Sequence, residues 1–393
     1  MKKIYFFIAC LVLIILIGDI SLIRTEKETS LAENRYLQKF EHFTLKSYLD
    51  GNYQNMLEKA LADQFIKSEG IKTKLNLNPT LFGAGNISNY ICENNYVHVG
   101  NSYYTYNCGD SIILKYLEED YKNNEHIKNR IDLYNKLNNY IDTYYYYLPT
   151  SNIFNFKENE LSIDVMKILK ENLKGNYKIT NLKVKDYDEY VNYFYKNDHH
   201  WNYKGSYQAY KDILSIIRPN DKPLEPTKKI TFEDIYFYGS GAKISNNYDI
   251  KENFTVYKFD YPEMETLINR EVSKYGNEDV YFNNEYETKR SVNHYGVFYG
   301  GDDAEIIFNT NKNKYNVLVL GTSYTNAINK LIASHFKKTH IIDLRHYERV
   351  FGEKFNIVNY IEENDIDKVL VITDYDFLKA EDCEIEWGDT DAI

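Results

Sequence analysis

The chain has 393 residues, and its 58 Asp and Glu side chains outnumber its 47 Lys and Arg, which gives a formal net charge of −11. An acidic surface repels a phosphate backbone, so the composition argues against nucleic acid as a partner. The 40 Tyr and 20 Phe residues are unusually many, and they are compatible with two causes, sugar-stacking surfaces or an A/T-rich genome.

The N-terminus has the pattern of an export signal. Lys2 and Lys3 precede residues 4–17, fourteen residues without a charge, and a further short apolar stretch ends at Ile23. A charged start followed by an apolar run is typical of a secretory signal, but no small-x-small cleavage site follows closely. We therefore predict an uncleaved membrane anchor over residues 1–23, with the lysines in the cytoplasm and the rest of the chain outside. A cleaved signal and a secreted protein are the alternative.

The next regions are predicted from hydrophobic spacing. Residues 24–106 form a membrane-proximal region, helical over 45–74 and mainly loops and short strands over 75–106. Residues 107–219 form the first part of an α/β domain. Its predicted helices cover 117–141, 161–173 and 205–217, and its predicted strands cover 144–148, 177–184 and 191–195.

A proline cluster then interrupts the pattern. Pro219, Pro223 and Pro226 lie within eight residues, and the stretch 220–292 has many turns and no strong period, so we predict an inserted, mainly β segment there. Residues 293–393 form the second part of the domain. From Tyr315 the order returns, with strands at 316–320, 339–344 and 368–374 and helices at 326–336 and 355–364. This alternation predicts a mostly parallel sheet with helices on both faces, and ligands bind at the carboxyl ends of the strands in such folds.

Four cysteines are present. Cys10 lies in the apolar N-terminal segment, which leaves Cys92, Cys108 and Cys383, an odd number that cannot all pair within one exported chain. A Cys92–Cys108 bridge would close a short loop, although the spacing does not demand it. No CxxC or Cys/His ligand pattern occurs, so the sequence predicts no structural zinc site.

Two segments of the sequence contain residues suited to acyl transfer. Ser323 follows the predicted strand 316–320, and His200 lies two residues after Asp198. A serine needs a base to become a nucleophile, and an imidazole oriented by a carboxylate is such a base. Ser323 also precedes a predicted helix, so the backbone N–H groups of Ser323 and Tyr324 and the side chain of Asn326 are candidate donors to an oxyanion. No cofactor is predicted.

Each motif has a structural alternative. Ser323 is equally compatible with a helix N-cap in a tight turn, and Asp198 with a cap for the helix that follows. An isolated histidine such as His200 often has only a structural role, which is also what we expect for His199. Trp201 is expected either in the core or as one wall of the site.

Metal binding is a further alternative for the same stretch. Asp198, His199 and His200 offer ligand atoms for a transition metal, and a phosphoesterase family carries an Asp-His-His signature. That family needs clustered upstream aspartates. Asp186 and Asp188 lie nearby but lack the family's glycine context, so we predict no metal at the site.

The sequence resembles the DHHW family of exported bacterial proteins. The resemblance rests on Asp198-His199-His200-Trp201 and the following residues 202–207. It extends to stretches 33–35, 63–65, 145–149, 321–326 and 343–345, and it is weakest over 220–290. The DHHW family is in turn similar to the alginate O-acetylation proteins AlgJ and AlgX, which have an SGNH-hydrolase-like domain whose acid and base precede the serine.

This resemblance implies a three-layer SGNH-like α/β/α fold with Asp198 as acid, His200 as base and Ser323 as nucleophile. It also implies an O-acetyltransferase or esterase acting on a cell-surface or exported polysaccharide, supplied by a membrane-bound acyltransferase partner. Arg345 matches an Asp-Leu-Arg block, for which an ion pair and substrate contact are both expected roles. A non-catalytic, membrane-anchored glycan-binding or assembly protein of the same fold is the alternative function.

Overall fold

The computed structural model describes residues 29–30, 35–36, 39–40, 44–49, 53–54, 56–57, 60, 92–99, 103–116, 124–156, 160–245, 247–310, 314–380 and 383–388. The chain divides into two compact units, Met1–Leu75 and Asn76–Ile393. The predicted anchor over residues 1–23 lies outside the described residues. Among the helices that are described, none has the length and apolar character needed to span a membrane.

In the first unit, the strand pair β1 (Thr29–Ser30) and β2 (Arg35–Tyr36) is antiparallel, and α2 covers Leu45–Leu49. The helix predicted over residues 45–74 is therefore described at its start. Further along it, five described residues between 53 and 60 are also helical.

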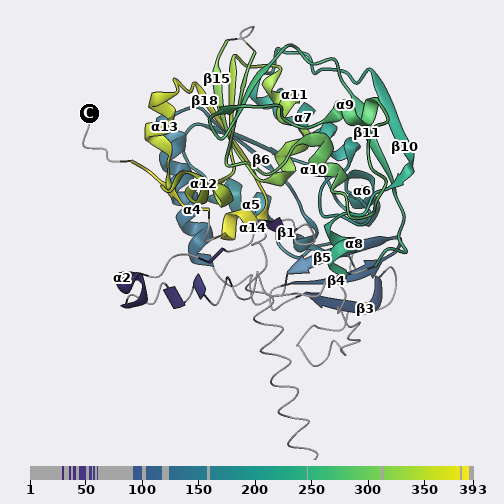
Figure 1. The fold of residues 1–393 in the computed structure, drawn as a ribbon. Helices are drawn as coiled ribbons and strands as arrows, with labels where there is room; N and C mark the ends of the chain where they lie inside the picture. Colours follow the sequence, from purple (N-terminus) through teal and green to yellow (C-terminus); the bar gives the residue numbers. More distant parts are fainter. Residues whose placement is uncertain are drawn as a thin grey trace, which may run out of the picture. The chain divides into compact units, whose positions relative to one another are not determined.

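The second unit is built on an eight-stranded sheet (Figure 1). Its strands, in spatial order, are β13 (Glu271–Val272), β12 (Glu265–Ile268), β14 (Glu305–Asn309), β16 (Lys338–Ile342), β15 (Asn316–Leu320), β18 (Lys368–Thr373), β6 (Thr143–Tyr147) and β9 (Tyr177–Asn181). The five strands from β16 to β9 are parallel, whereas β14, β12 and β13 extend one edge in antiparallel pairings. The predicted mostly parallel sheet is confirmed.

The order of the parallel strands is a circularly permuted, or rotated, form of a common strand order. Counted from β15, the neighbours β16-β15-β18-β6-β9 have the order 2-1-3-4-5, which is the flavodoxin-like doubly wound arrangement. In this chain, however, the fourth and fifth strands come first in the sequence. A long segment between Ile217 and Asn316 then leads to the first strand, and it contains β10 to β14.

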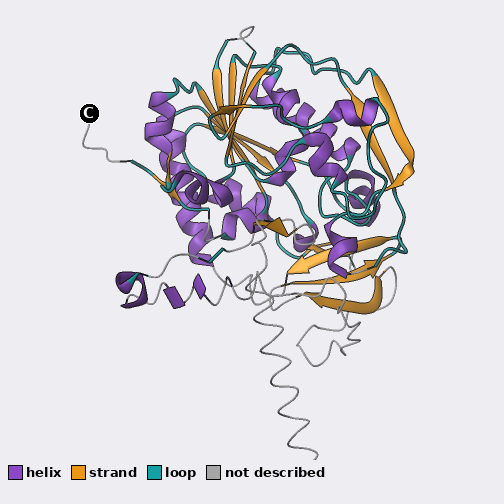
Figure 2. Ribbon diagram, viewed as in Figure 1, coloured by secondary structure: helices purple, strands orange, loops and turns teal. Residues whose placement is uncertain are grey.

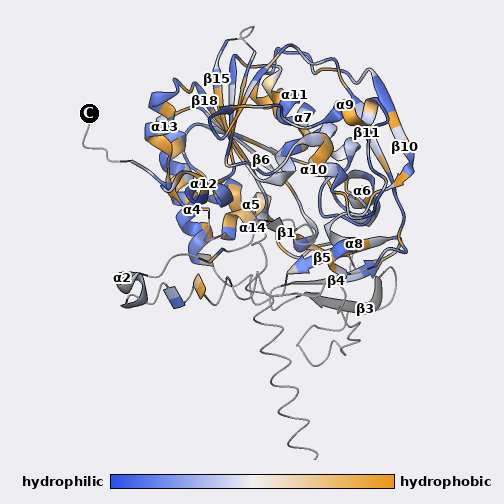
Figure 3. Cartoon of the chain, viewed as in Figure 1, coloured by the Kyte–Doolittle hydropathy of each residue, from blue (hydrophilic) through white to orange (hydrophobic). Residues whose placement is uncertain are grey.

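Helices cover both faces of the sheet (Figure 2). On one face, α7 (Tyr203–Ile217) and α11 (Asn329–Ala333) pack against each other and against β6, β9, β14 and β16. The other side carries α4 (Asn124–Tyr140), α5 (Val165–Asn172), α12 (Leu344–Phe351), α13 (Ile357–Glu363) and α14 (Tyr375–Lys379). In Figure 3, α11 and α13 carry both hydrophobic and hydrophilic stretches, as expected for helices between a sheet and solvent.

Smaller elements surround this core. They are the three-stranded sheet β3 (Cys92–Val99), β4 (Tyr103–Cys108) and β5 (Ser111–Tyr116), the ribbon β10 (Lys228–Tyr236) and β11 (Asn253–Lys258), the pairs β7 (Phe154–Asn155) with β8 (Glu160–Leu161) and β17 (Phe355–Asn356) with β19 (Ile385–Glu386), and the helices η3 (Ser151–Ile153), α6 (Tyr187–Tyr193), α8 (Ser240–Ser245), α9 (Glu278–Phe282), α10 (His294–Tyr299) and η4 (Ser323–Ala327). Cys108 is in a disulfide, and Cys92 is opposite it in the β3–β4 register.

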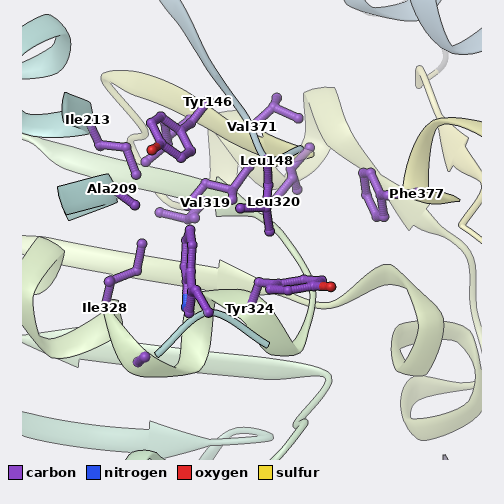
Figure 4. Packing of buried hydrophobic residues seen from close by; sticks show 14 of the residues in the cluster. Tyr146, Leu148, Ala209, Ile213, Val319, Leu320, Tyr324, Ile328, Val371 and Phe377 are labelled. Carbon is purple, nitrogen blue, oxygen red and sulfur yellow. The ribbon is translucent and has the colours of Figure 1, made fainter. Parts of the chain in front are cut away.

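Burial on both faces explains the composition of the central strands. All five residues of β15 are buried, and so are all five of β6, whose sequence is Thr-Tyr-Tyr-Tyr-Tyr. Parallel strands covered by helices on both sides need apolar or aromatic side chains at successive positions. Figure 4 shows Val319 of β15 near Ile213 of α7 and Ile328, while Leu320 of β15 and Val371 of β18 lie beside Leu148.

Two sequence predictions of local structure were wrong. The strand predicted over residues 191–195 begins inside α6, because Tyr187, Tyr190 and Phe194 face the core at helical spacing and the Asp186 carboxylate caps the first turn. The strand predicted over 339–344 ends at Ile342, because Asp343 caps α12, a helix that the prediction missed.

Candidate active site

His200 lies in a tightly tied loop between α6 and α7. The Tyr195 N–H donates to the His200 carbonyl at 3.1 Å, and the Asn202 N–H donates to the Tyr193 carbonyl at 2.8 Å. Asn202 also caps α7, since its Oδ1 accepts from the N–H groups of Lys204 and Gly205. Asn202 therefore takes the capping role considered for Asp198, whose carboxylate points elsewhere.

Ser323 lies at the carboxyl end of β15, beside the point where the strand order reverses. Thr322 is the N-cap of η4, and Ser323 is its first residue. The preceding Gly321 donates its N–H to the Ile342 carbonyl at the end of β16, so the turn is fixed to the neighbouring strand. This is the edge of the sheet at which ligands bind in doubly wound folds.

The segment that contains Asp198 and His200 meets the segment that contains Ser323 at this edge. His200 Nε2 lies 2.9 Å from Ser323 Oγ, and His200 Nδ1 lies 2.5 Å from Asp198 Oδ1. The three side chains are buried, with residue exposures of 3% for His200, 5% for Ser323 and 6% for Asp198. Asp198, His200 and Ser323 thus form the hydrogen-bonded series that the sequence predicted.

The Asp198 carboxylate is held by two further hydrogen bonds. Its Oδ1 accepts the His200 backbone N–H at 2.8 Å, and its Oδ2 accepts the Ser240 N–H at 2.6 Å. Burial opposes ionisation, but the imidazoles of His200 and His199 and the hydrogen bonds outweigh it and hold the pKa of Asp198 well below its usual range. The carboxylate is therefore ionised at neutral pH and can stabilise an imidazolium.

His199 is a neutral neighbour of the series. Burial, followed by the like charge of His200, lowers the pKa of His199 to about 3. Its Nδ1 lies 2.5 Å from Ser240 Oγ, and its side chain is 26% exposed, much more than that of His200. His199 therefore lies on the solvent side of the buried pair.

The candidate oxyanion donors fall into two groups. Ser323 and Tyr324 begin η4, and the first N–H groups of a helix have no acceptor within the helix, so these backbone groups fit the role. The Asn326 amide instead donates to the Gly300 carbonyl at 3.2 Å and to Asp302 Oδ1 at 2.9 Å. Its side-chain N–H groups are thus directed away from the oxyanion role.

Aromatic residues line the site. The Tyr324 hydroxyl donates to the His199 carbonyl at 3.1 Å, and its ring lies 5.1 Å from the His200 ring. Trp201 is fully buried, with its ring 5.9 Å from Tyr324 and 6.5 Å from Tyr146. Of the two roles predicted for Trp201, the structure gives it the core position, supporting the wall that Tyr324 forms.

Arg345 is part of an ion-pair network beside the site. Its Nη2 lies 2.5 Å from Asp343 Oδ2 and 3.3 Å from Asp302 Oδ2, while its Nε donates to Asp343 Oδ1 at 2.9 Å. Burial opposes its charge, but the two carboxylates outweigh this and raise the pKa of Arg345. Because Asp302 also binds Asn326, the network joins the loop after α10 to η4 and to the end of β16.

Two groups of side chains have metal-ligand chemistry. The donor atoms of Asp198, His199 and His200 lie within 4.8 Å of one another, as do those of Asp302, Asp343 and His346. In the first group, both ring nitrogens of His200 already have partners, Asp198 and Ser323. His200 would have to give up one of these hydrogen bonds to bind a metal.

Sequence reasoning missed three residues that contact the site. Gly239 and Ser240 approach Asp198, and the Tyr295 ring stacks on His200. All three come from the long segment between α7 and β15. No local motif marks them, because only the tertiary fold brings them to the site.

Among known proteins, similarity to this chain is found in solved structures. No protein-family model matches the sequence, and no curated protein matches it. The solved structure of PatB1 from Bacillus cereus with a sulfonyl adduct is similar to 72% of this chain and 97% of its own, with 18% identity and a TM-score of 0.53. The O-acetyltransferase domain of Pseudomonas putida AlgJ is more distant, with 9% identity over 73% of this chain and 92% of its own and a TM-score of 0.33.

A DHHW family protein from Eubacterium siraeum is similar to 75% of this chain and 97% of its own, with 18% identity and a TM-score of 0.52. The resemblance predicted from the stretch that begins at Asp198 is thus confirmed at the level of the fold: this chain is similar in structure to a DHHW family protein.

Proposed function

We propose that this protein is a serine-dependent O-acyltransferase that moves an acetyl group to a carbohydrate hydroxyl through an acyl-enzyme on Ser323. The observation that carries the proposal is the 2.9 Å contact between His200 Nε2 and Ser323 Oγ, with Asp198 on the other ring nitrogen. A nucleophile within reach of a base that is itself oriented by a third group is the minimal apparatus for acyl transfer.

The steps follow from this geometry. His200 Nε2 takes the Ser323 proton while Oγ attacks the donor's carbonyl carbon, and the resulting oxyanion accepts from the N–H groups at the start of η4. The imidazolium, stabilised by Asp198, then protonates the leaving oxygen, which departs and leaves acetyl on Ser323. In the second half, His200 deprotonates an acceptor hydroxyl, which attacks the acyl-enzyme, and the proton returns to Ser323 Oγ.

Transfer and hydrolysis use the same residues. They differ in whether a sugar hydroxyl or water reaches the acyl-enzyme, and the burial of Ser323 and His200 restricts the approach of bulk water. An exported or cell-surface polysaccharide as acceptor, a membrane-bound acyltransferase as donor, and a location outside the membrane behind the anchor at residues 1–23 are proposed from the sequence resemblance.

The nucleophile can be tested by covalent labelling. PatB1 is described with a sulfonyl adduct, and sulfonyl fluorides modify activated serines, so such a reagent should label Ser323 in this protein. Ser323→Ala should abolish both labelling and hydrolysis of 4-nitrophenyl acetate, while Ser215→Ala, a change at an exposed serine of α7, should leave both unchanged. Equal labelling of Ser323→Ala and wild type would rule out Ser323 as the nucleophile.

The acceptor is tested separately. Incubation with 4-nitrophenyl acetate and neutral oligosaccharides should give sugars heavier by one acetyl group in mass spectra, and the products should disappear with Ser323→Ala. Release of acetate alone, across a range of oligosaccharides, would identify the enzyme as an esterase instead.

A further inference from the structure

Tyr295 contacts both members of the proposed catalytic pair. Its ring lies nearly parallel to the His200 ring, with centroids 4.3 Å apart and planes at 19°. Its hydroxyl donates to the Ser323 carbonyl at 3.2 Å and lies 3.5 Å from the Tyr324 carbonyl. One side chain thus bridges two residues that are 123 positions apart in the sequence.

The two contacts restrict different motions. The stacked ring covers one face of the His200 imidazole, while His199, at a centroid distance of 3.9 Å, and Tyr324 crowd it from other directions. Rotation of the imidazole away from Ser323 would break this packing. The hydroxyl contact acts on the serine side, because the Ser323 carbonyl belongs to the first residue of η4 and moves with Oγ.

Tyr295 is itself firmly placed. It is 3% exposed, and it lies on α10, whose N-terminus is capped by Asn293 through the Gly296 N–H. The adjacent His294 is tied to the Tyr281 hydroxyl at 2.8 Å. Burial raises the pKa of Tyr295 well above its usual range, so its hydroxyl stays protonated near neutral pH and can donate its hydrogen bond.

The stacked ring also matches the charge that forms during the reaction. When His200 takes the Ser323 proton, a cation develops against the face of an aromatic ring, an arrangement that is attractive at short distance. The same ring therefore restrains the neutral imidazole and favours the protonated one.

We propose that Tyr295 is a positioning residue that aligns the His200 imidazole with Ser323 Oγ from the segment between α7 and β15. This inference rests on the proposed function of Ser323 and His200. A misplacement of about 1 Å in such a pair costs on the order of 100-fold in rate, and loss of one neutral hydrogen bond costs about 2- to 10-fold.

The test separates the ring from the hydroxyl. In steady-state hydrolysis of 4-nitrophenyl acetate, Tyr295→Leu should lower kcat about 100-fold and leave KM within about threefold. Tyr295→Phe, which keeps the ring, should recover most of the rate and remain about 2- to 10-fold below wild type. Tyr281→Phe removes a buried hydroxyl next to the same helix without touching the pair, and it should keep wild-type kcat.

A wild-type kcat in folded Tyr295→Leu would overturn the inference, as would equal losses of kcat and thermal stability in Tyr295→Phe and Tyr281→Phe. If Tyr295→Leu does not fold, Tyr295→Phe decides, and its wild-type kcat would overturn the inference. Ser323→Ala distinguishes the two proposals, because persistent turnover there contradicts the proposed function, whereas loss of turnover there with unchanged Tyr295 variants contradicts only the positioning role.

Discussion

Replacing Gly239 by alanine should disable the site, although Gly239 is not one of the three catalytic residues. A Cβ built there would lie 1.9 Å from Asp198 Oδ2, 2.1 Å from its Cβ and 2.3 Å from its Cγ. Rotation of the Asp198 side chain cannot relieve contact with its own Cβ, so the backbone of one of the two loops has to move. The Gly239 N–H is also bound to Asn197 Oδ1 at 2.9 Å, which ties these loops together.

The size of the effect follows from these distances. Since Cβ contacts under 3.0 Å are essentially never seen, Asp198 has to retreat by roughly 1 Å, and its 2.5 Å hydrogen bond to His200 Nδ1 is stretched or lost. Misplacement on this scale costs about 10²-fold and loss of the orienting carboxylate about 10⁴-fold. Gly239→Ala should therefore lower kcat by about 10²- to 10⁴-fold and stability by about 1–3 kcal/mol, the usual range for overpacking.

The assay is hydrolysis of 4-nitrophenyl acetate together with thermal unfolding. Gly301→Ala is the matched control, because a Cβ there meets one side-chain oxygen, Asp303 Oδ2, at 3.9 Å, and it should keep wild-type values. A Gly239→Ala protein with wild-type kcat and melting temperature would refute the reasoning. Asp198 would then tolerate displacement, and its orientation of His200 would not limit the rate.

Three further changes test charged side chains of the site and of the fold around it. Asp198→Asn should keep the fold but lower kcat about 10³- to 10⁴-fold, and an unchanged kcat would remove Asp198 from the mechanism. Asp374 is the buried N-cap of α14 directly after β18. Burial raises the pKa of Asp374 to about 7, so the folded state holds a proton that the unfolded state releases as pH rises above about 4. The stability of Asp374→Asn relative to wild type should therefore increase between pH 4 and 7, by at most about 1.4 kcal/mol per pH unit, and level off above pH 7 in urea titrations; a constant difference would contradict this. Arg345→Lys loses the forked contacts to Asp343 and Asp302 and should lower stability by about 1–3 kcal/mol in thermal unfolding, whereas an unchanged melting temperature would mean that the network adds nothing to stability.

The predictions that the structure confirms rest on recognisable patterns or motifs in the sequence. β15 has the predicted bounds, 316–320, because a strand buried on both faces must be continuously apolar. The approach of His200 to Ser323 was predicted because a serine nucleophile needs a base, and because the resemblance to the DHHW family implied these residues as acid, base and nucleophile. The helix α6 was missed because its tyrosines suit a strand equally well, although Asp186 and Glu189 form a capping pattern that marks a helix start.

Gly239, Ser240 and Tyr295 had no comparable signal, and the topology explains why. In the rotated 2-1-3-4-5 order, the loop that carries Asp198 and His200 follows the fifth strand, while Ser323 follows the first, so acid and base precede the nucleophile in the chain. The rotation also requires a connection from α7 to β15, which an unrotated chain would not need, and in this chain it is the long segment between Ile217 and Asn316. That connection places two backbone N–H groups and a glycine against the Asp198 loop and an aromatic ring against His200. The connection between α7 and β15 therefore contributes to the alignment of the site. Substitutions at its contact residues Gly239 and Tyr295 should lower kcat, whereas Tyr281→Phe and Gly301→Ala in the same connection should not.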